Sequence, residues 1–354
     1  MAEVNIDNHY QLTHHGGVAL QRDVTPRRDV TPRRDMTPRR DTARRHRAAR
    51  RAAEAVLVAG VLALTACGGA GGAGSSSGST PDRLTVVAGF YPLQWAAEQI
   101  GDAVASVDNL TPAGAEPHDL ELTPQQVAMI AEADLVVYIS GFQPALDEAI
   151  AQQAADRALD VLDVVEPLAG DTHDHEESGP GATTDPHIWL DPRAMNQIGS
   201  AIAERLTALA PKETDRIRES MVKFGQEMTE VDSAWKAGTA TCASRDLVVS
   251  HEAFGYLARA YNFSQVGISG LSPDAEPSPA TIAEVSSFVR DRGITTIYYE
   301  TLVDPKIAQT IAAETGATTA VLDPIEGLVE GSDADYLSLM SANLDAVRAG
   351  NQCR

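Results

Sequence analysis

The chain has 354 residues, 43% of them hydrophobic, which is enough for a packed core and for two ordinary domains. Its net charge of −22 argues against a nucleic-acid partner, because phosphate binding depends on clustered lysine and arginine. The charge is unevenly distributed. Residues 1–66 hold 12 basic and 7 acidic side chains, leaving 16 of the 28 basic and 43 of the 50 acidic ones to residues 67–354, a net charge of −27.

The N-terminal segment has the features of an export signal. A basic region at 44–54 precedes an apolar run at 55–66, and Cys67 follows directly. Twelve apolar residues are too few to span a bilayer comfortably, so we expect a cleaved signal rather than a membrane helix. The ending "LTAC", Leu64 to Cys67, resembles the lipobox of bacterial lipoproteins, which implies acylation of Cys67. A plain secretory signal with an incidental cysteine is the alternative.

Two further segments around this signal predict no fold. A hexapeptide repeated three times occupies 23–40 and lacks any apolar periodicity. Because a signal covering all of 1–66 would be unusually long, Met36 is an alternative start. Behind Cys67, the glycine- and serine-rich residues 67–81 predict a flexible tether to a lipid anchor.

From residue 82 onward, short β-rich runs alternate with helical patterns, which predicts α/β units over mostly parallel sheets. We expect two lobes flanked by helices, over 82–210 and 241–354, with a ligand cleft between them. A linking helix over 211–240 would join them stiffly, since 212–238 can form one stretch of about 40 Å. The expected buried strands are 84–90, 133–140, 246–251, 295–300 and 318–324, and the expected helices include 92–101, 123–133, 278–293, 305–316 and 335–350.

Five of the nine histidines follow the predicted signal, and none of them lies on an apolar helical face. His118 lies in a polar loop, His187 lies between two Asp-Pro pairs, and His251 ends a predicted strand. With Asp323, three of these four positions fall at or just past a strand end, where open α/β sheets place ligands. Three imidazoles and a carboxylate would suit tetrahedral Zn²⁺. Taken singly, a loop histidine is more often solvated, and Asp323 would be an ordinary turn residue.

Six motifs, in this order, resemble the zinc receptors of bacterial metal ABC transporters, the ZnuA-like group within the wider cluster of zinc, manganese and iron receptors. The motifs are "EPHDLELTP", "DPHIWLDP", "SHEAFGYLARAY", "VGISGLSPDAEPSP", "YYETLVDPKIA" and "VLDPIEG". The resemblance covers nearly all of 84–354 and implies a metal site in the cleft between two α/β lobes. The implied ligands are His118, His187, His251 and Asp323, with Glu116 or a water as the alternative fourth ligand.

The third ligand position bears on the choice of metal. Manganese receptors of this cluster carry a carboxylate there, whereas His251 completes a set of three imidazoles, which favours zinc. The resemblance implies a monomeric, lipid-anchored extracytoplasmic receptor that passes Zn²⁺ to an ABC permease with its cytoplasmic ATPase and catalyses nothing. A manganese or iron receptor and a surface adhesin of the same fold remain alternatives. A zinc hydrolase fits less well, because Gly255 replaces the second histidine of H-E-x-x-H.

Other residues extend this expected site. The run "THDHEE" at 172–177 resembles a histidine- and acid-rich loop of zinc members, in which His173, Asp174 and His175 would hold metal weakly. A solvated acidic loop is the alternative. Asp185 and Glu300 are candidates to hold an imidazole N–H and fix its tautomer, or else to be solvated or capping residues.

The cysteines predict a disulfide. Once Cys67 is acylated, Cys242 and Cys353 are the two thiols that remain, and an exported protein meets oxidising conditions. We therefore expect them to pair and to hold the C-terminal helix near the strand that ends in His251. Two free cysteines are the alternative.

Overall fold

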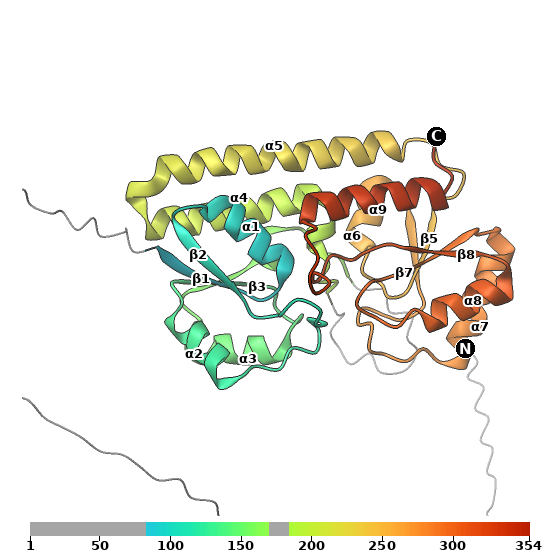
Figure 1. Cartoon of the computed structure of the whole chain (residues 1–354), viewed down its shortest axis with the longest axis horizontal. Helices are drawn as coiled ribbons and strands as arrows, with labels where there is room; N and C mark the ends of the chain where they lie inside the picture. Colours follow the sequence, from blue (N-terminus) through green and yellow to red (C-terminus); the bar gives the residue numbers. More distant parts are fainter. Residues whose placement is uncertain (1–82, 170–183) are drawn as a thin grey trace, which may run out of the picture. The chain divides into compact units, whose positions relative to one another are not determined.

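The computed structural model describes residues 83–169 and 184–354 (Figure 1). Every described residue belongs to one compact unit, Ser75–Arg354. Within the described residues, no helix is long and apolar enough to cross a membrane. Several predictions concern residues outside the described ranges, namely the segment 1–66 with the start at Met36, the lipidated Cys67 and tether 67–81, and the loop 172–177 with His173, Asp174 and His175.

The first lobe is built on a four-stranded parallel sheet with the order β2-β1-β3-β4. Helices α2 and α3 cover one face of this sheet, and α1 covers the other (Figure 1). The elements are β1 (Leu84–Ala88), α1 (Tyr91–Gly101), β2 (Ala105–Asn109), α2 (Pro124–Glu132), β3 (Leu135–Tyr138), α3 (Pro144–Gln153), β4 (Ala158–Asp160) and the short helix η1 (Val161–Val164).

The second lobe repeats this order as β6-β5-β7-β8, again all parallel. Alternate strand residues face opposite layers: Val248 and Ile297 share an apolar cluster with α7 and α8, whereas Leu247 and Tyr298 join the cluster that contains α6 and α9. The elements are β5 (Asp246–Val249), α6 (Gly255–Tyr261), β6 (Ser264–Gly267), α7 (Pro279–Arg292), β7 (Thr296–Tyr299), α8 (Lys306–Thr315), β8 (Thr318–Val321) and α9 (Tyr336–Gly350). The predicted two-lobed α/β fold is therefore confirmed.

A helical hairpin connects the lobes. It consists of η2 (Ile188–Leu190), α4 (Pro192–Leu209), the turn η3 (Pro211–Glu213) and α5 (Thr214–Gly238). The 25 residues of α5 span about 38 Å and run beside α4 and α9, so that this helix contacts both lobes (Figure 1). At its C-terminal end, Trp235 stacks on Tyr261 at 5.2 Å and donates a hydrogen bond to the Met340 carbonyl at 3.2 Å.

Three strands that the sequence did not predict lie at sheet edges. They are β2, β4 and β6, and most of their residues are half-buried or exposed. A continuous apolar run is the sequence signal of a strand buried on both faces, and an edge strand need not have one. Three of the four edge strands were missed for this reason, whereas the fourth, β8, falls within the expected strand 318–324.

The largest apolar core extends through both lobes and encloses the segment after His187. Trp189 is fully buried, packs on Phe90 with ring centroids 4.7 Å apart, and donates to the Pro324 carbonyl at 2.7 Å. The Tyr336 hydroxyl donates to the Trp189 carbonyl at 2.6 Å. This segment belongs to the first lobe in sequence, but the second lobe holds it by these hydrogen bonds.

The structure contains the expected disulfide between Cys242 and Cys353. It joins the segment before β5 to the residues after α9. Backbone hydrogen bonds lie beside it, from Ala243 to the Asn351 carbonyl at 3.0 Å and from Arg354 to the Thr241 carbonyl at 2.8 Å. The C-terminus is thereby fixed next to the strand that precedes His251.

Candidate metal centre

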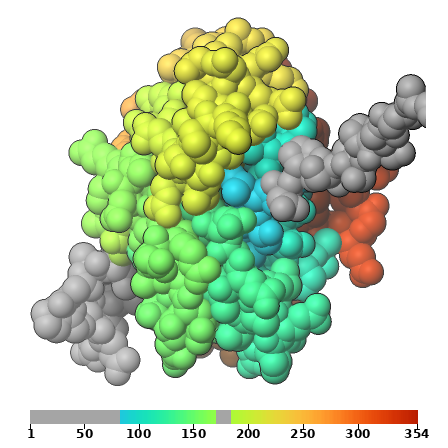
Figure 2. Space-filling model, turned by 90° about the vertical axis from the view of Figure 1, so that its left-hand side faces the viewer, coloured from blue at the N-terminus to red at the C-terminus, as the bar shows by residue number. Residues whose placement is uncertain are grey.

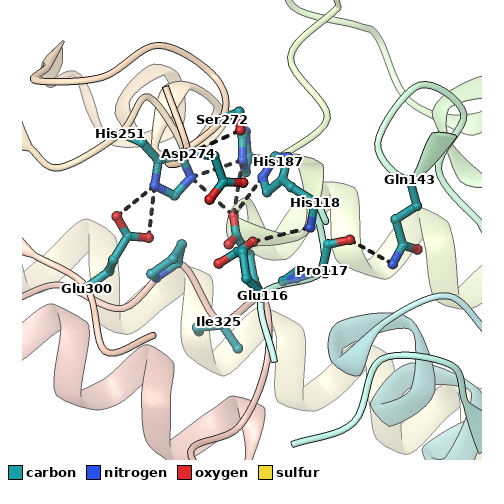
Figure 3. A network of polar contacts seen from close by, with 12 residues as sticks. Glu116, Pro117, His118, Gln143, His187, His251, Ser272, Asp274, Glu300 and Ile325 are labelled. Atoms are coloured by element: carbon teal, nitrogen blue, oxygen red, sulfur yellow. Dashed lines mark hydrogen bonds and ion pairs between the residues drawn. The ribbon is translucent and has the colours of Figure 1, made fainter. Parts of the chain in front are cut away.

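Four side chains of metal-ligating type converge between the lobes. Each offers one ligand atom, and these atoms all lie within 4.8 Å of one another. Figure 3 shows the three imidazoles facing a common point, with carboxylates around them. The four residues are His118, His187, His251 and Glu326.

His118 comes from the loop between β2 and α2. The buried amide of Gln143 donates to the Pro117 carbonyl at 3.2 Å, and the Gly114 amide donates to the Leu328 carbonyl of the second lobe at 2.7 Å. The imidazole packs edge-on against Phe142 at 4.5 Å between centroids. Its side chain is 11% exposed and is the least buried of the four.

His187 is the residue before the short helix η2. Asp185 accepts hydrogen bonds from its backbone amide at 2.9 Å and from its Nδ1 at 2.7 Å, which leaves Nε2 free to bind a metal. A Cβ atom at Gly255 would lie 2.4 Å from the Asp185 carboxylate, so only glycine leaves room for this carboxylate. Tyr256 completes the arrangement by donating to the Asp185 carbonyl at 3.1 Å.

His251 lies two residues beyond β5, and Glu300 follows β7 directly. Because β5 and β7 are neighbours in the sheet, these two side chains meet at its carboxyl edge. The Nδ1 of His251 lies 2.9 Å from the Glu300 carboxylate. His187 and His251 thus share one design, in which a buried carboxylate holds Nδ1–H and turns Nε2 toward the centre.

Glu326 reaches the centre because of a tight turn after β8. Asp323 accepts a hydrogen bond from the Ile325 amide at 2.7 Å, and Ile325 adopts a left-handed φ of 57°. Asn343 pairs with both the amide and the carbonyl of Asp323, at 2.8 and 2.6 Å. The other Asp323 oxygen accepts from Thr301 at 2.9 Å. Asp323 is therefore the turn residue, and Glu326 is the carboxylate of the four-residue group.

Four of the six separations within the group lie near the edge length of a tetrahedral zinc site. A tetrahedron with bonds of about 2.0 Å has edges of about 3.3 Å. The Glu326 Oε1 lies 3.2 Å from Nε2 of His187, 3.2 Å from Nε2 of His251 and 3.6 Å from Nε2 of His118. The Nε2 atoms of His187 and His251 are 3.4 Å apart. The protein alone holds these atoms near the spacing that a bound ion requires.

The charges of the centre are strongly coupled. Burial by itself lowers the pKa of His187 and His251, but the carboxylates bonded to them outweigh it and raise both values, that of His251 well above the usual range. Burial alone would raise the pKa of Glu326, but the attraction of His251 and the close approach of the three imidazoles hold it well below its usual value. Glu326 is therefore ionised and is the anionic member of the four-residue group.

Glu116 lies next to this group without belonging to it. One of its oxygens accepts from the His118 amide at 3.3 Å. Burial, reinforced by the nearby Glu326 carboxylate, raises the pKa of Glu116 to about 8. This side chain is thus held neutral beside an anionic one.

Unsatisfied polar atoms support a cation at this point. Within the described structure, three buried atoms of the centre lack a hydrogen-bond partner: His118 Nε2, Glu326 Oε2 and Glu116 Oε2. Buried polar atoms without partners are rare in folded proteins, and each calls for a ligand or another explanation. Two of the three, His118 Nε2 and Glu326 Oε2, belong to the candidate ligand group, and both accept rather than donate when the imidazole Nε2 is unprotonated.

The structure thus brings together three of the four residues expected as ligands and adds Glu326, which the sequence analysis did not single out. Glu326 stands in the same motif, "VLDPIEG", three residues after Asp323. A usable signal was present, because an aspartate before proline favours a local turn and the next carboxylate is then free to point inward. The two candidates for holding imidazole N–H groups, Asp185 and Glu300, both occupy that position.

Comparisons with known proteins agree with this geometry. Residues 86–350 match the family model described as "ZnuA: Zinc-uptake complex component A periplasmic". The high-affinity zinc uptake system protein ZnuA of Bacillus subtilis is 32% identical over 307 residues, which cover 83% of this chain and 95% of that protein. The zinc-binding lipoprotein AdcA of Streptococcus pneumoniae is 33% identical over 278 residues, 75% of this chain, and the match spans only 55% of AdcA.

A solved structure extends the likeness to the fold. The Zn(II)-bound ZnuA-like domain of Streptococcus pneumoniae AdcA superposes with a TM-score of 0.65 at 30% identity, covering 76% of this chain and 99% of that one. The family match covers well over half of the chain and includes both sheets and all four converging side chains. The chain therefore belongs to the ZnuA family of zinc-uptake components.

Proposed function

We propose that this protein is an extracytoplasmic zinc receptor that captures Zn²⁺ between its lobes and delivers it to an ABC permease with a cytoplasmic ATPase. Its ligands are His118, His187, His251 and Glu326. The observation that carries the proposal is the convergence of their ligand atoms, four of whose six separations are 3.2 to 3.6 Å, close to the edges of a tetrahedral zinc site. Zinc is the cargo of this protein.

The donor set supports zinc over manganese. Three neutral imidazoles and one carboxylate form a borderline donor set that suits zinc, whereas manganese receptors benefit from additional oxygen ligands. Glu116 lies outside the group of converging ligand atoms, and in the metal-free centre its raised pKa of about 8 favours the protonated form at neutral pH. Glu326 is therefore the one carboxylate within the group of converging ligand atoms.

The same ligand set explains why the family acts by binding and not by catalysis. A catalytic zinc keeps one position open for water or substrate, whereas four protein side chains fill a tetrahedral site. All four side chains here come from the protein, and three of them are at most 1% exposed. A receptor needs this closure in order to hold the ion tightly.

The receptor is anchored through an acylated Cys67. The "LTAC" ending of the apolar run supports this anchor, and the related AdcA of Streptococcus pneumoniae is itself named a lipoprotein. In a monomeric receptor, residues 67–81 then serve as the tether. Loss of membrane association in Cys67→Ala, with zinc binding intact, is the expected result; membrane association that persists in this variant would contradict the anchor.

The loop 172–177 collects zinc weakly and passes it to the tight site. Its support is the sequence "THDHEE", which places His173, Asp174 and His175 ten or more residues before His187. Deleting 172–177 is expected to leave the affinity of the tight site unchanged and to lower the zinc bound at excess metal. A collapse of tight binding would assign a ligand to this loop instead.

Isothermal titration calorimetry with Zn²⁺ and Mn²⁺ tests the receptor directly. The metal-free protein is expected to bind one Zn²⁺ per chain and to bind Mn²⁺ far more weakly, since the three imidazoles favour zinc. A stoichiometry other than one, or an equal affinity for Mn²⁺, would overturn the proposed site.

A further inference from the structure

The end of α4 and the start of α5 form an exposed surface that the metal centre does not use. A hollow between the two helices is apolar along its floor, and Val222 at its rim is 57% exposed. Leu209, the last residue of α4, is 42% exposed. We call residues 203–223 the hairpin surface. Its apolar lining comprises Ala203 and Ala208 of α4 and Ile217, Met221 and Val222 of α5.

The hairpin surface differs in charge from the rest of the protein. Residues 203–223 carry five basic and four acidic side chains, a net charge of +1, in a body of −27, and Lys223 lies 3.6 Å from the Glu227 carboxylate just beyond them. Arg216 and Arg218 are paired with acidic residues one turn earlier, with closest N–O distances of 3.4 and 2.7 Å. Exposed pairs of this kind contribute little to stability, so that both guanidinium groups can exchange these partners for phosphate oxygens.

The described chain begins close to this surface. Arg83, its first residue, donates to the carbonyls of Asp102 and Ala105, and a Cβ at the neighbouring Gly101 would lie 3.7 Å from Leu206 of α4. Figure 2 shows the first described residues, in blue, on the same face as the start of α5, in yellow. Only fifteen residues separate Arg83 from Cys67, a path of at most about 55 Å when fully extended.

We propose that the hairpin surface rests on the head groups of an anionic lipid bilayer, the same bilayer in which Cys67 is anchored. The inference rests on the proposed lipidation of Cys67. Lys212, Arg216, Arg218 and Lys223 contact lipid phosphates while Val222 and Leu209 enter the interfacial layer. The strongly acidic remainder of the protein is repelled by the same lipids, so that this face alone is held against the membrane.

Lysine footprinting of the intact lipidated protein tests this proposal. The protein is placed on vesicles of phosphatidylcholine, with or without about a third of phosphatidylglycerol, and labelled with a water-soluble amine reagent. Lys306 on α8 is the matched control, because its side chain is 81% exposed and that of Lys223 is 71% exposed. We expect labelling of Lys212 and Lys223 to slow about threefold on anionic vesicles only, with Lys306 unchanged.

A variant sharpens the test. Arg216→Gln with Arg218→Gln removes two basic groups of the surface and leaves the metal centre untouched, so the protection of Lys223 should fall while zinc binding stays the same. Equal labelling of Lys223 on neutral and anionic vesicles overturns the proposal. Protection that instead rises with protein density on neutral vesicles identifies a second copy as the partner, which also overturns it.

The readouts separate this proposal from the receptor function. Zinc titration of the same samples reports the metal centre independently of the lipid. Flotation of the wild-type protein with neutral vesicles reports the anchor, and a protein that fails to float refutes the lipidation on which the proposal rests. A protein that floats and binds zinc but shows no lipid-dependent protection leaves the receptor intact and removes only the hairpin contact.

Discussion

The two sheets have the same strand order, yet they deliver side chains to the metal centre in different ways. In the second lobe, Glu300, His251 and Glu326 follow their strands by one, two and five residues. In the first lobe, His118 lies nine residues beyond the end of β2. In the second lobe, the pairing of neighbouring strands therefore positions the side chains of the metal centre. In the first lobe, tertiary hydrogen bonds position His118.

The contacts around His187 show which lobe holds most of the metal centre in place. It precedes α4 and so belongs in sequence to the first lobe, but Tyr256 binds the carbonyl of its partner Asp185, and Tyr336 binds the carbonyl of Trp189. Three of the four proposed ligands are thus attached to the second lobe, and His118 alone is presented by the first. Substitutions in the second lobe should accordingly lower the affinity for zinc more than substitutions in the first lobe.

Removing a ligand of the second lobe should have the largest effect. A structural zinc contributes on the order of 12 kcal/mol through four ligands, or about 3 kcal/mol each, which is more than a hundredfold in affinity. His251→Ala should therefore weaken Zn²⁺ by more than about a hundredfold in competition titrations with a chelator. Lys236→Ala on α5, far from the ligands in sequence, is the control; an unchanged affinity in His251→Ala would exclude this residue from the site.

Opening the disulfide should destabilise the second lobe by about 3 kcal/mol, a typical value for a native bridge. The bridge closes a loop of 111 residues between Cys242 and Cys353. We expect Cys242→Ser with Cys353→Ser to lower the urea midpoint of the metal-free protein, because the unfolded chain gains conformational freedom. Thiol counting on the denatured, unreduced wild type is the companion measurement, and two free thiols there would refute the bridge.

The carboxylates behind the imidazoles should have an intermediate effect. Partners of this kind typically account for 10- to 100-fold in metal affinity, or about 1.4 to 2.8 kcal/mol. We expect Glu300→Gln and Asp185→Asn to fall in this range, since the amide oxygen still accepts from Nδ1–H but carries no charge. Asp304→Asn, an exposed residue in the same loop as Glu300, is the control. A loss as large as that of His251→Ala would mean that Glu300 binds the ion itself.

Loosening the first-lobe loop should have the smallest effect. Gln143 is buried and donates to the carbonyls of Gly89 and Pro117 and to the Thr111 hydroxyl. Gln143→Ala removes these bonds, and we expect zinc affinity to fall by less than about tenfold, because His118 keeps its tie through Gly114. Gln152→Ala, an exposed residue of the same helix, should leave affinity unchanged. A loss of zinc affinity above a hundredfold would show that the first lobe contributes more than the second to positioning the ligands.

Sequence patterns predicted the four central strands, the edge strand β8 and the long helices. The central strands and the long helices have continuous apolar runs or helical periodicity, and two helices end at Gly293 and Gly316, which adopt left-handed φ angles of 64° and 81°. The edge strands β2, β4 and β6 lack such runs, because one of their sides faces solvent. Their existence depends on neighbours that a single segment does not reveal.

The fourth ligand shows the same limit at the scale of a side chain. Both Asp323 and Glu326 are acidic, lie after β8 and belong to one motif, so spacing alone does not rank them. The ranking comes from Asn343 on α9 and from the Ile325 turn, which engage the backbone and one oxygen of Asp323 and direct Glu326 to the imidazoles. This information resides in contacts between distant segments, and it appears only when the chain is folded.

Zinc titration of Glu326→Gln beside Asp323→Asn tests the assigned ligand set most directly. The two substitutions are the same chemical change at positions three residues apart, and each replaces a carboxylate by its amide. We expect Glu326→Gln to weaken Zn²⁺ by on the order of a hundredfold, through loss of the anionic ligand, and Asp323→Asn by less than about tenfold, through loosening of the turn. The reverse ranking, with Asp323→Asn the more damaging, would contradict the four-ligand centre described above.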